Sequence, residues 1–198
     1  ITCGDSLMPS LEPDLLHAAV GIMFTFRHCD SIVVRNLELN GNIDEAILGG
    51  KSFWDGMQTD YDGVMIWESS RCLIDSVRAH HFGRDGLLVS GNHGSNTTPF
   101  MEGYPELHVT LDPVDSLVVD SNRTVIFNNT IQHSSFNWNG RQGISWTGCA
   151  GLHLIDCDLN YTGAGRIASS PSAGLDIEGV GGPMRVRYGV FDDCRFLH

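Results

Sequence analysis

Short alternations of apolar and polar residues, separated by turn residues, run through the chain from about residue 20 onward. They are clearest in residues 61–91, where the phrase DGVMI at 62–66 returns as DGLLV at 85–89, 23 residues later. Strict alternation is typical of β-strands that bury one face. A repeat of this length built of strands predicts one coil of a parallel β-solenoid.

A constant spacing relates the repeats to one another. In three copies, the residue that starts the first strand stands 13 residues before a polar corner residue, and two more copies fit if insertions of 29 and 6 residues are allowed. The chain is therefore expected to form five coils. The pairs of start and corner residues are Met23 and Asn36, Gly63 and Ser76, Gly86 and Asn128, Gly143 and Asp156, and Gly174 and Asp193.

Stacked coils place like positions above one another, so the spacing predicts columns of buried side chains. The first strands are expected to bury Phe24 and Phe26, Val64 and Ile66, Leu87 and Val89, Ile144 and Trp146, and Leu175 and Ile177. Later columns are Val34, Ile74, Ile126, Leu154 and Phe191; Leu37, Val77, Asn129, Cys157 and Cys194; and Leu39, Ala79, Ile131, Leu159 and Phe196. Columns that mix Cys with other small polar residues favour packed thiols over disulfides for the six cysteines.

Residues 1–19 do not fit the repeat and are expected to be a lead-in or the remains of an upstream segment. Residues 20–198 are expected to form the repeat domain. A solenoid that ends without a polar cap exposes an apolar end face. Residues 194–198 have the pattern of a strand without such a cap, so we expect the domain to be part of a longer protein.

The phrases at residues 32–42, 72–76, 80–86 and 154–159 resemble the repeats of the pectate-lyase-like superfamily. The resemblance implies an all-β fold, a single-stranded right-handed parallel β-helix of about five coils with loop insertions. It implies a secreted or cell-surface protein that acts on polysaccharide in a groove along one parallel sheet. The paired-aspartate and Gly-His-Gly pattern of polygalacturonases is absent, as is the Asp-Pro-His-Asp signature of mannuronan epimerases, so no activity transfers residue by residue.

Charge narrows the class of partner. The chain has 12 basic and 24 acidic residues and a net charge of −12, which argues against nucleic acid, because phosphate binding needs a basic face. An acidic surface suits neutral sugars, or anionic sugars bridged by Ca²⁺. No apolar run approaches the roughly 20 residues that span a bilayer, so no membrane span is expected.

Two reactions can be built from the side chains that point outward from the first strands. In β-elimination on a uronic acid, Arg84 or Arg141 would neutralise the carboxylate and His80 or His81 would abstract the proton. In glycoside hydrolysis, Asp176 with Glu178, or Asp85 with Asp176, would be the carboxylate pair. The predicted catalytic residues are Arg84, Arg141, Asp176, Glu178 and His81, and the predicted calcium ligands are Asp62 and Asp85.

Aromatic and amide side chains are expected to contact the sugar, because exposed aromatic rings stack on sugar rings. These are Trp54, Trp67, Gln142 and Tyr104. Simpler interpretations stay open: Asp62 and Asp85 as turn residues at the start of a strand, and Arg84 with Asp85 as a surface ion pair. A non-catalytic β-helix that binds carbohydrate or serves as a tailspike or adhesin segment is the alternative to an enzyme.

Overall fold

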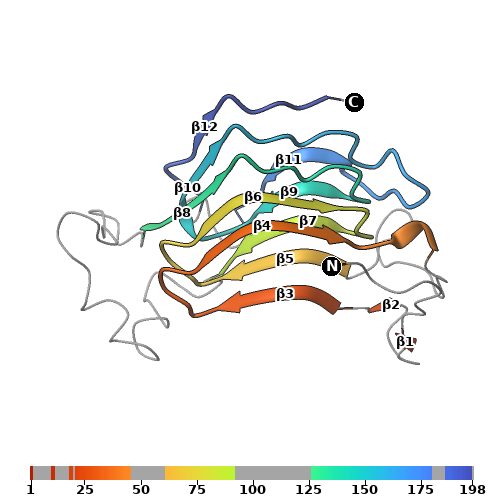
Figure 1. Cartoon of the computed structure of the whole chain (residues 1–198), viewed down its shortest axis with the longest axis horizontal. Coiled ribbons are helices and arrows are strands. Elements are labelled where there is room, and N and C mark those ends of the chain that lie inside the picture. The colour runs from red at the N-terminus through yellow and green to blue at the C-terminus, as the bar shows by residue number, and fades with distance from the viewer. Residues whose placement is uncertain are drawn as a thin grey trace.

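The computed structural model describes residues 1, 10–11, 18–19, 21–45, 61–91, 126–179 and 186–197. The regular secondary structure of these residues is almost entirely β-strand, with one short 3-10 helix, η1 (Ile43–Glu45). Ten strands form two parallel sheets of five, and successive strands alternate between the sheets (Figure 1). The all-β class predicted from the alternation is therefore confirmed.

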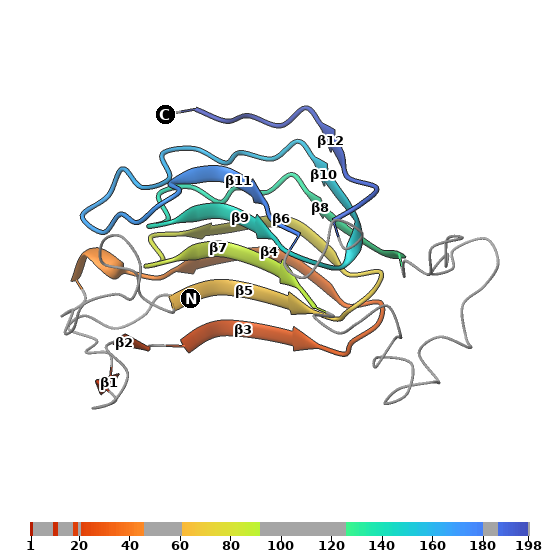
Figure 2. The same ribbon diagram turned by 180° about the vertical axis from the view of Figure 1, so that it is seen from behind.

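Each sheet is ordered as the chain runs. Sheet 1 contains β3 (Gly21–Arg27), β5 (Tyr61–Trp67), β7 (Asp85–Ser90), β9 (Gln142–Trp146) and β11 (Ala173–Ile177). Sheet 2 contains β4 (Val33–Asn40), β6 (Leu73–His80), β8 (Ile126–Gln132), β10 (Ala150–Ile155) and β12 (Val190–Asp192). One strand of each sheet makes a rung, and the five rungs lie above one another (Figures 1 and 2).

Part of the first 19 residues is also described. The two short strands β1 (Ser10–Leu11) and β2 (Ala18–Ala19) pair antiparallel, outside the two large sheets. The predicted domain boundary near residue 20 stays a prediction.

The strand register confirms the predicted columns of sheet 1, but Ile177 in the last rung is 48% exposed and not buried as predicted. Phe24 pairs with Val64, Val64 with Leu87, Leu87 with Ile144, and Ile144 with Leu175. In the three middle rungs these side chains are fully buried in the core between the two sheets. The alternation was sufficient to place them, because a shift of one residue would turn every apolar side chain to the wrong face.

Four of the five predicted corner residues lie where the spacing places them. Asn36, Ser76, Asp156 and Asp193 have positive φ angles of 55°, 56°, 49° and 52°. Asn and Asp tolerate this left-handed region better than most residues. The long strands β4 and β6 therefore change direction at Asn36 and Ser76 without ending.

The predicted register of the third corner, Asn128, is wrong. Ile131, not Ile126, pairs with Ile74 and Leu154, and the residue in the corner is His133, with a φ of 48°. Asn128 also has a positive φ, of 52°, but it belongs to an irregularity in the pairing of β8 with β10. An asparagine in a left-handed conformation thus resembled a corner five residues too early.

The other columns shift in the same way. Ser134 replaces Asn129 beside Val77 and Cys157, and Phe136 replaces Ile131 beside Ala79 and Leu159. Buried Asn129 instead bridges two rungs: its amide donates to the Ser69 carbonyl (2.9 Å), and its Oδ1 accepts the Cys72 amide (3.0 Å). The five described cysteines are free thiols.

Glycines at the start of the sheet 1 strands allow the rungs to approach closely. A Cβ added at Gly63 would lie 2.5 Å from the Gly86 carbonyl oxygen, and one at Gly143 would lie 2.6 Å from that of Gly174. The repeated glycine therefore follows from backbone packing. No helix in the described part of the chain has the length and apolar character to cross a membrane.

Candidate functional site

Two ion pairs, Asp62 with Arg84 and Asp85 with Arg141, lie at the start of β5, β7 and β9, and we call them the ion-pair row. Each aspartate in this ion-pair row is held by the arginine of the following rung. Arg84 contacts both oxygens of Asp62, with its Nε at 2.9 Å and its Nη2 at 2.8 Å. Arg141 does the same for Asp85, with its Nε at 2.9 Å from Oδ1 and its Nη2 donating to Oδ2. These forked pairs are the geometry in which a guanidinium binds a carboxylate most strongly.

The aspartates of the row are buried and the arginines cover them. Asp62 and Asp85 are 1% and 0% exposed, while the Arg84 and Arg141 side chains are 18% and 20% exposed. Burial, with the charge of Asp85, raises the pKa of Asp62 to about 7, and Arg84 opposes the rise. Burial also raises the pKa of Asp85, against the hydrogen bond from Arg141. Both guanidiniums bind buried carboxylates. We therefore expect the ion-pair row to stabilise the folded protein.

Gln142 extends the row to β11. Its side-chain amide donates to Oδ2 of Asp176, while its buried Oε1 has no hydrogen-bond partner among the described residues. Asp176 is partly exposed, and Glu178, two residues further, is exposed. The structure therefore brings Asp176 to the row and leaves Glu178 at the surface.

The two predicted calcium ligands, Asp62 and Asp85, both belong to the ion-pair row. Asp62 and Asp85 face guanidinium groups, which repel a cation at short range. No group of three or more His, Cys, Asp or Glu residues within the described residues could hold a metal ion. Calcium stays a prediction.

The predicted sugar-binding residues are dispersed. Trp67 lies on β5. The guanidinium of Arg27 lies over its ring, 5.8 Å from the ring centre, and so covers part of one face. Trp54 and Tyr104 lie outside the described residues. The outward positions of β7 and β9, such as Leu88 and Ser145, are 8% and 1% exposed, so the middle of this face is covered.

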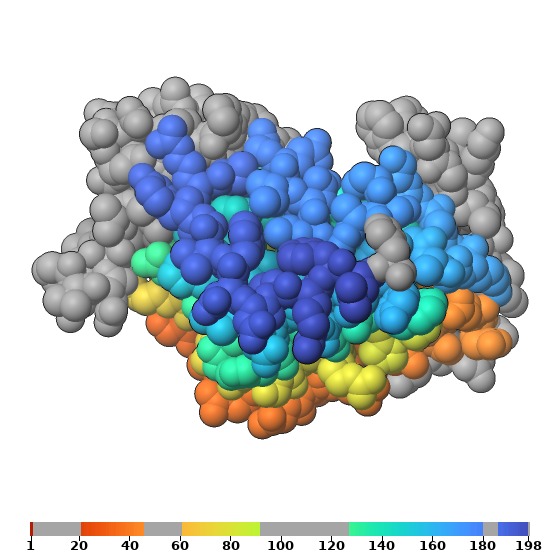
Figure 3. All heavy atoms as spheres, turned by 90° about the horizontal axis from the view of Figure 1, so that it is seen from above, coloured from red at the N-terminus to blue at the C-terminus, as the bar shows by residue number. Residues whose placement is uncertain are grey.

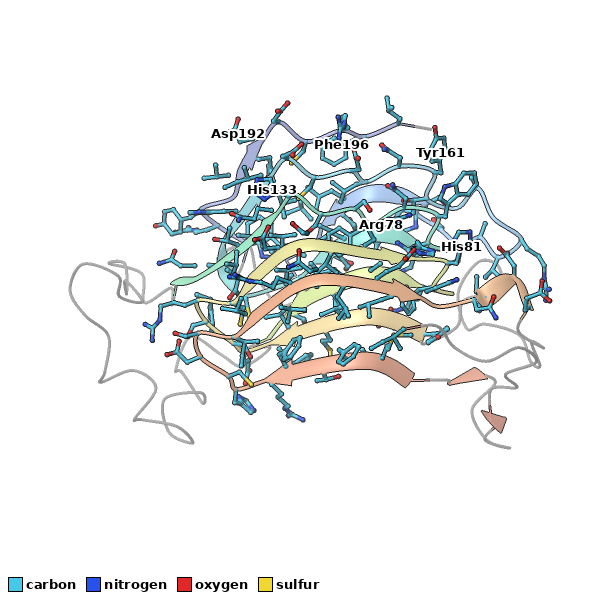
Figure 4. The ribbon with its side chains drawn as sticks, viewed as in Figure 1. Arg78, His81, His133, Tyr161, Asp192 and Phe196 are labelled. Carbon is cyan, nitrogen blue, oxygen red and sulfur yellow. The ribbon has the colours of Figure 1, made fainter. Side chains whose placement is uncertain are left out.

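A second group of polar residues lies where sheet 2 ends, and we call it the histidine corner. It contains Glu38, Asp44, His80 and His81, from β4, η1, β6 and the residue after β6. His80 Nε2 lies 3.1 Å from Glu38 Oε1, and His80 Nδ1 lies 2.7 Å from His81 Nδ1. His81 Nε2 lies 3.8 Å from Asp44 Oδ2. Figure 4 shows His81 at this end of the stack, near η1.

When His80 is neutral, the hydrogen-bond chain sets the tautomers of both histidines. Since the Glu38 carboxylate can only accept, His80 donates through Nε2 and, when neutral, accepts at Nδ1. His81 then donates through Nδ1, so its lone pair is at Nε2. Burial, with the nearby His80 charge, lowers the pKa of His81, and the hydrogen bond from His80 lowers the pKa of Glu38. With His80 neutral, the chain therefore leaves the lone pair of His81 Nε2 on a side chain that is partly exposed.

Two aromatic residues that the sequence interpretation missed stand above His81. Trp138 stacks on His81 with ring centres 6.2 Å apart and planes 8° apart, and Tyr161 stacks on Trp138 at 4.6 Å and 20°. Trp138 and Tyr161 are 40% and 37% exposed, so their ring edges form a stripe beside the histidine corner. A signal was present: HFGRDG at 81–86 aligns with WNGRQG at 138–143, which places Trp138 over His81.

Comparisons with known proteins give limited information. No family model matches the chain, and no solved structure matches it. The chain is similar to the SPbeta prophage-derived uncharacterized protein YorA of Bacillus subtilis (strain 168), with 25% identity over 168 residues. The match covers 76% of the chain and 25% of that protein, so the chain spans about a quarter of the relative's length. This similarity assigns no family, and the function has to be argued from the site.

Proposed function

We propose that the two sheets belong to a right-handed parallel β-helix that acts on a uronic-acid-containing polysaccharide by β-elimination. His81 is the proposed general base. The observation that carries the proposal is the chain from Glu38 through His80 to His81, which leaves the basic nitrogen of His81 at the surface. A base held by an orienting partner is the arrangement that general base catalysis requires.

The reaction balances without an oxidant or reductant. His81 Nε2 takes the proton from the carbon next to the uronate carboxylate, and that electron pair forms the new C4=C5 double bond. The bond from C4 to the glycosidic oxygen breaks, and the leaving oxygen takes up a proton from solvent water. The imidazolium that forms is stabilised by Asp44 at 3.8 Å and, through His80, by Glu38.

The histidine corner also has cations for an acidic sugar. Arg78 is 66% exposed and lies 3.4 Å from Glu38, and the exposed Arg166 donates to the Asp44 carbonyl. In this proposal they take the neutralising role that was predicted for Arg84 and Arg141. The latter arginines are bound to buried aspartates, which makes them poor candidates.

A non-catalytic glycan-binding or structural β-helix is the second candidate. The exposed edges of Trp138 and Tyr161 favour it, because aromatic groups bind sugars without any acid or base. The similarity to a prophage-derived protein also agrees with a tailspike-like role. A glycoside hydrolase that uses Asp176 and Glu178 is the remaining alternative and is tested in the same experiment.

The test is incubation with pectate, alginate and neutral glycans, followed by ultraviolet absorbance and a reducing-end assay. Absorbance from unsaturated sugar ends is expected, with a loss of about 10²–10⁴-fold in His81→Gln. His133→Gln is the matched control, because His133 is an exposed histidine that bonds Asp75 (3.0 Å) on the same sheet. Reducing ends without absorbance would indicate a hydrolase, and binding without products would indicate the second candidate.

A further inference from the structure

We infer that Asn139, a buried residue of the following rung, is a positioning residue for His81. Asn139 lies between β8 and β9 and is 0% exposed. Its Nδ2 donates to the Ala79 carbonyl (3.3 Å), and its Oδ1 accepts the Phe82 amide (3.1 Å). These two backbone groups flank His80 and His81. The effect of Asn139 on turnover rests on the proposed function, whereas its effect on the geometry of His81 does not.

The contacts of Asn139 fix the orientation of its amide group. A backbone carbonyl can only accept and a backbone N–H can only donate, so turning the amide over would break both hydrogen bonds. The carbonyl of Phe82 is bound as well, because it accepts the Gly140 amide at 2.8 Å. The amide of Asn139 fits here because residue 86 is a glycine, where an added Cβ would lie 2.5 Å from Asn139 Nδ2. Figure 3 looks down the stack and shows later rungs lying over earlier ones, so a side chain of one rung can fix the turn of the rung before it.

The backbone of His81 needs such support. Its φ of 55° lies in the left-handed region, which costs free energy for a residue with a Cβ and persists where the surroundings hold it. From the preceding rung, the amides of Gly41 and Ile43 donate to the carbonyls of His80 (2.9 Å) and His81 (3.0 Å). Asn139 supplies the bonds from the other side. This backbone keeps His81 Nδ1 at 2.7 Å from His80 Nδ1.

A second asparagine makes the same contacts at a turn that contains no histidine. Asn129 is also 0% exposed, and it donates to the Ser69 carbonyl (2.9 Å) and accepts the Cys72 amide (3.0 Å). These groups flank Arg71, whose φ is 51°. Asn129 therefore matches Asn139 in burial, in hydrogen bonds and in the conformation of the turn. A difference between variants of the two residues reports on the histidines and not on the loss of a buried asparagine.

Nitrogen NMR of histidine-labelled protein tests the position of His81 without any substrate. In the wild type at pH 8, His81 should have a protonated Nδ1 and an unprotonated Nε2, with its signals assigned by their loss in His81→Gln. In Asn139→Ala the bond from His81 to His80 is expected to be lost, so both nitrogen signals should shift toward the average of the two tautomers. Asn129→Ala is the matched control and should keep the wild-type signals.

Kinetics on the substrate of the proposed elimination give the second measurement. Asn139→Ala should lower kcat about 10–100-fold and change KM by less than about threefold, because a displaced base slows the chemical step and not substrate binding. Asn129→Ala should keep both constants while its Tm falls by a comparable amount. Asn139→Ser is a milder change, since a hydroxyl can still bond one of the two backbone groups, and its kcat should lie between those of Asn139→Ala and the wild type.

Wild-type signals of His81 in Asn139→Ala overturn the inference, as does the same shift in Asn129→Ala. Loss of folding in both Asn139 variants, while Asn129→Ala folds, also overturns it, because Asn139 is then part of the scaffold. Shifted signals with an unchanged kcat contradict the role of His81 as the base. Absence of elimination by the wild type contradicts the proposed function alone, since the NMR measurement needs no turnover.

Discussion

Replacing Arg84 with alanine is expected to destabilise the protein strongly. The change removes both guanidinium contacts to Asp62, at 2.9 and 2.8 Å, and leaves that carboxylate with the Asp85 amide at 3.0 Å. Removing one partner of a buried ion pair costs about 3–5 kcal/mol. Asp85 keeps Arg141, so we expect the lower end of that range, about 3 kcal/mol, and a fall in Tm of roughly 6–12 °C for a chain of this size.

The loss should depend on pH, with a sign fixed by Asp62. Its pKa in the folded protein is about 7, above the value of about 3.9 in an unfolded chain. Its contribution to stability is therefore fully present below about pH 4 and falls as pH rises to about 7, by up to about 1.4 kcal/mol per pH unit. Arg84 lowers this pKa, so its removal raises it further and extends the fall above pH 7. The difference between variant and wild type should be larger at pH 8 than at pH 5.

Urea unfolding followed by circular dichroism at pH 5 and pH 8 measures both effects. Arg78→Ala is the matched control, because Arg78 is 66% exposed in its ion pair with Glu38 and its loss should cost under about 1 kcal/mol. Equal losses for the two variants would refute the argument that the ion-pair row is a buried stabilising element. A difference from wild type that is the same at both pH values would refute the assignment to Asp62.

Three further predictions concern the stack itself. Gly63→Ala should destabilise the protein by about 1–3 kcal/mol in thermal unfolding, because its Cβ would meet the Gly86 carbonyl oxygen at 2.5 Å. Gly165→Ala is the control and should leave stability unchanged, because among the described residues its Cβ would meet only Asp44 Oδ1, at 3.9 Å. Asn129→Ala should lower the free energy of unfolding by about 1–3 kcal/mol. It should also speed hydrogen exchange of the Cys72 amide, because that amide loses its acceptor, and unchanged exchange would contradict the bridging role. Burial raises the pKa of Cys149 and Cys157 to about 12. A thiol reagent should therefore modify the partly exposed Cys29 and Cys194 before Cys149 and Cys157, as peptide mass spectrometry can show.

Sheet 1 could be predicted from the sequence because its signals agree with one another. Alternation sets the buried face, and the glycines that let the rungs approach mark where each strand begins. The β8 register could not be predicted in the same way. Asn128 has the side chain and the φ angle of a corner residue, and only the pairing of Ile131 with Ile74 shows that the corner is at His133.

The roles of the polar residues depended on burial, which the alternation does not give. Asp62 and Asp85 were expected to face solvent because they alternate with apolar residues, yet they are buried by the arginines of the following rungs. The contact of Glu38 with His80 joins residues 42 positions apart, on neighbouring strands. Such a pair follows from the register of β4 with β6, which the 13-residue spacing does contain.

One turn connects the ion-pair row to the histidine corner, and it allows their roles to be separated. His81 and Arg84 flank Phe82, which is fully buried, and the Phe82 amide donates to Asn139 Oδ1 at 3.1 Å. Because this turn is fixed by the next rung, a change at His81 should leave Arg84 in place. His81→Gln removes one stacked ring and one hydrogen bond, so it should cost under about 1.5 kcal/mol while abolishing elimination. Arg84→Ala should show the opposite balance, a large loss of stability with turnover retained in the molecules that stay folded. If His81→Gln instead unfolds the protein as Arg84→Ala does, the histidine corner is part of the scaffold, and the base must be sought elsewhere.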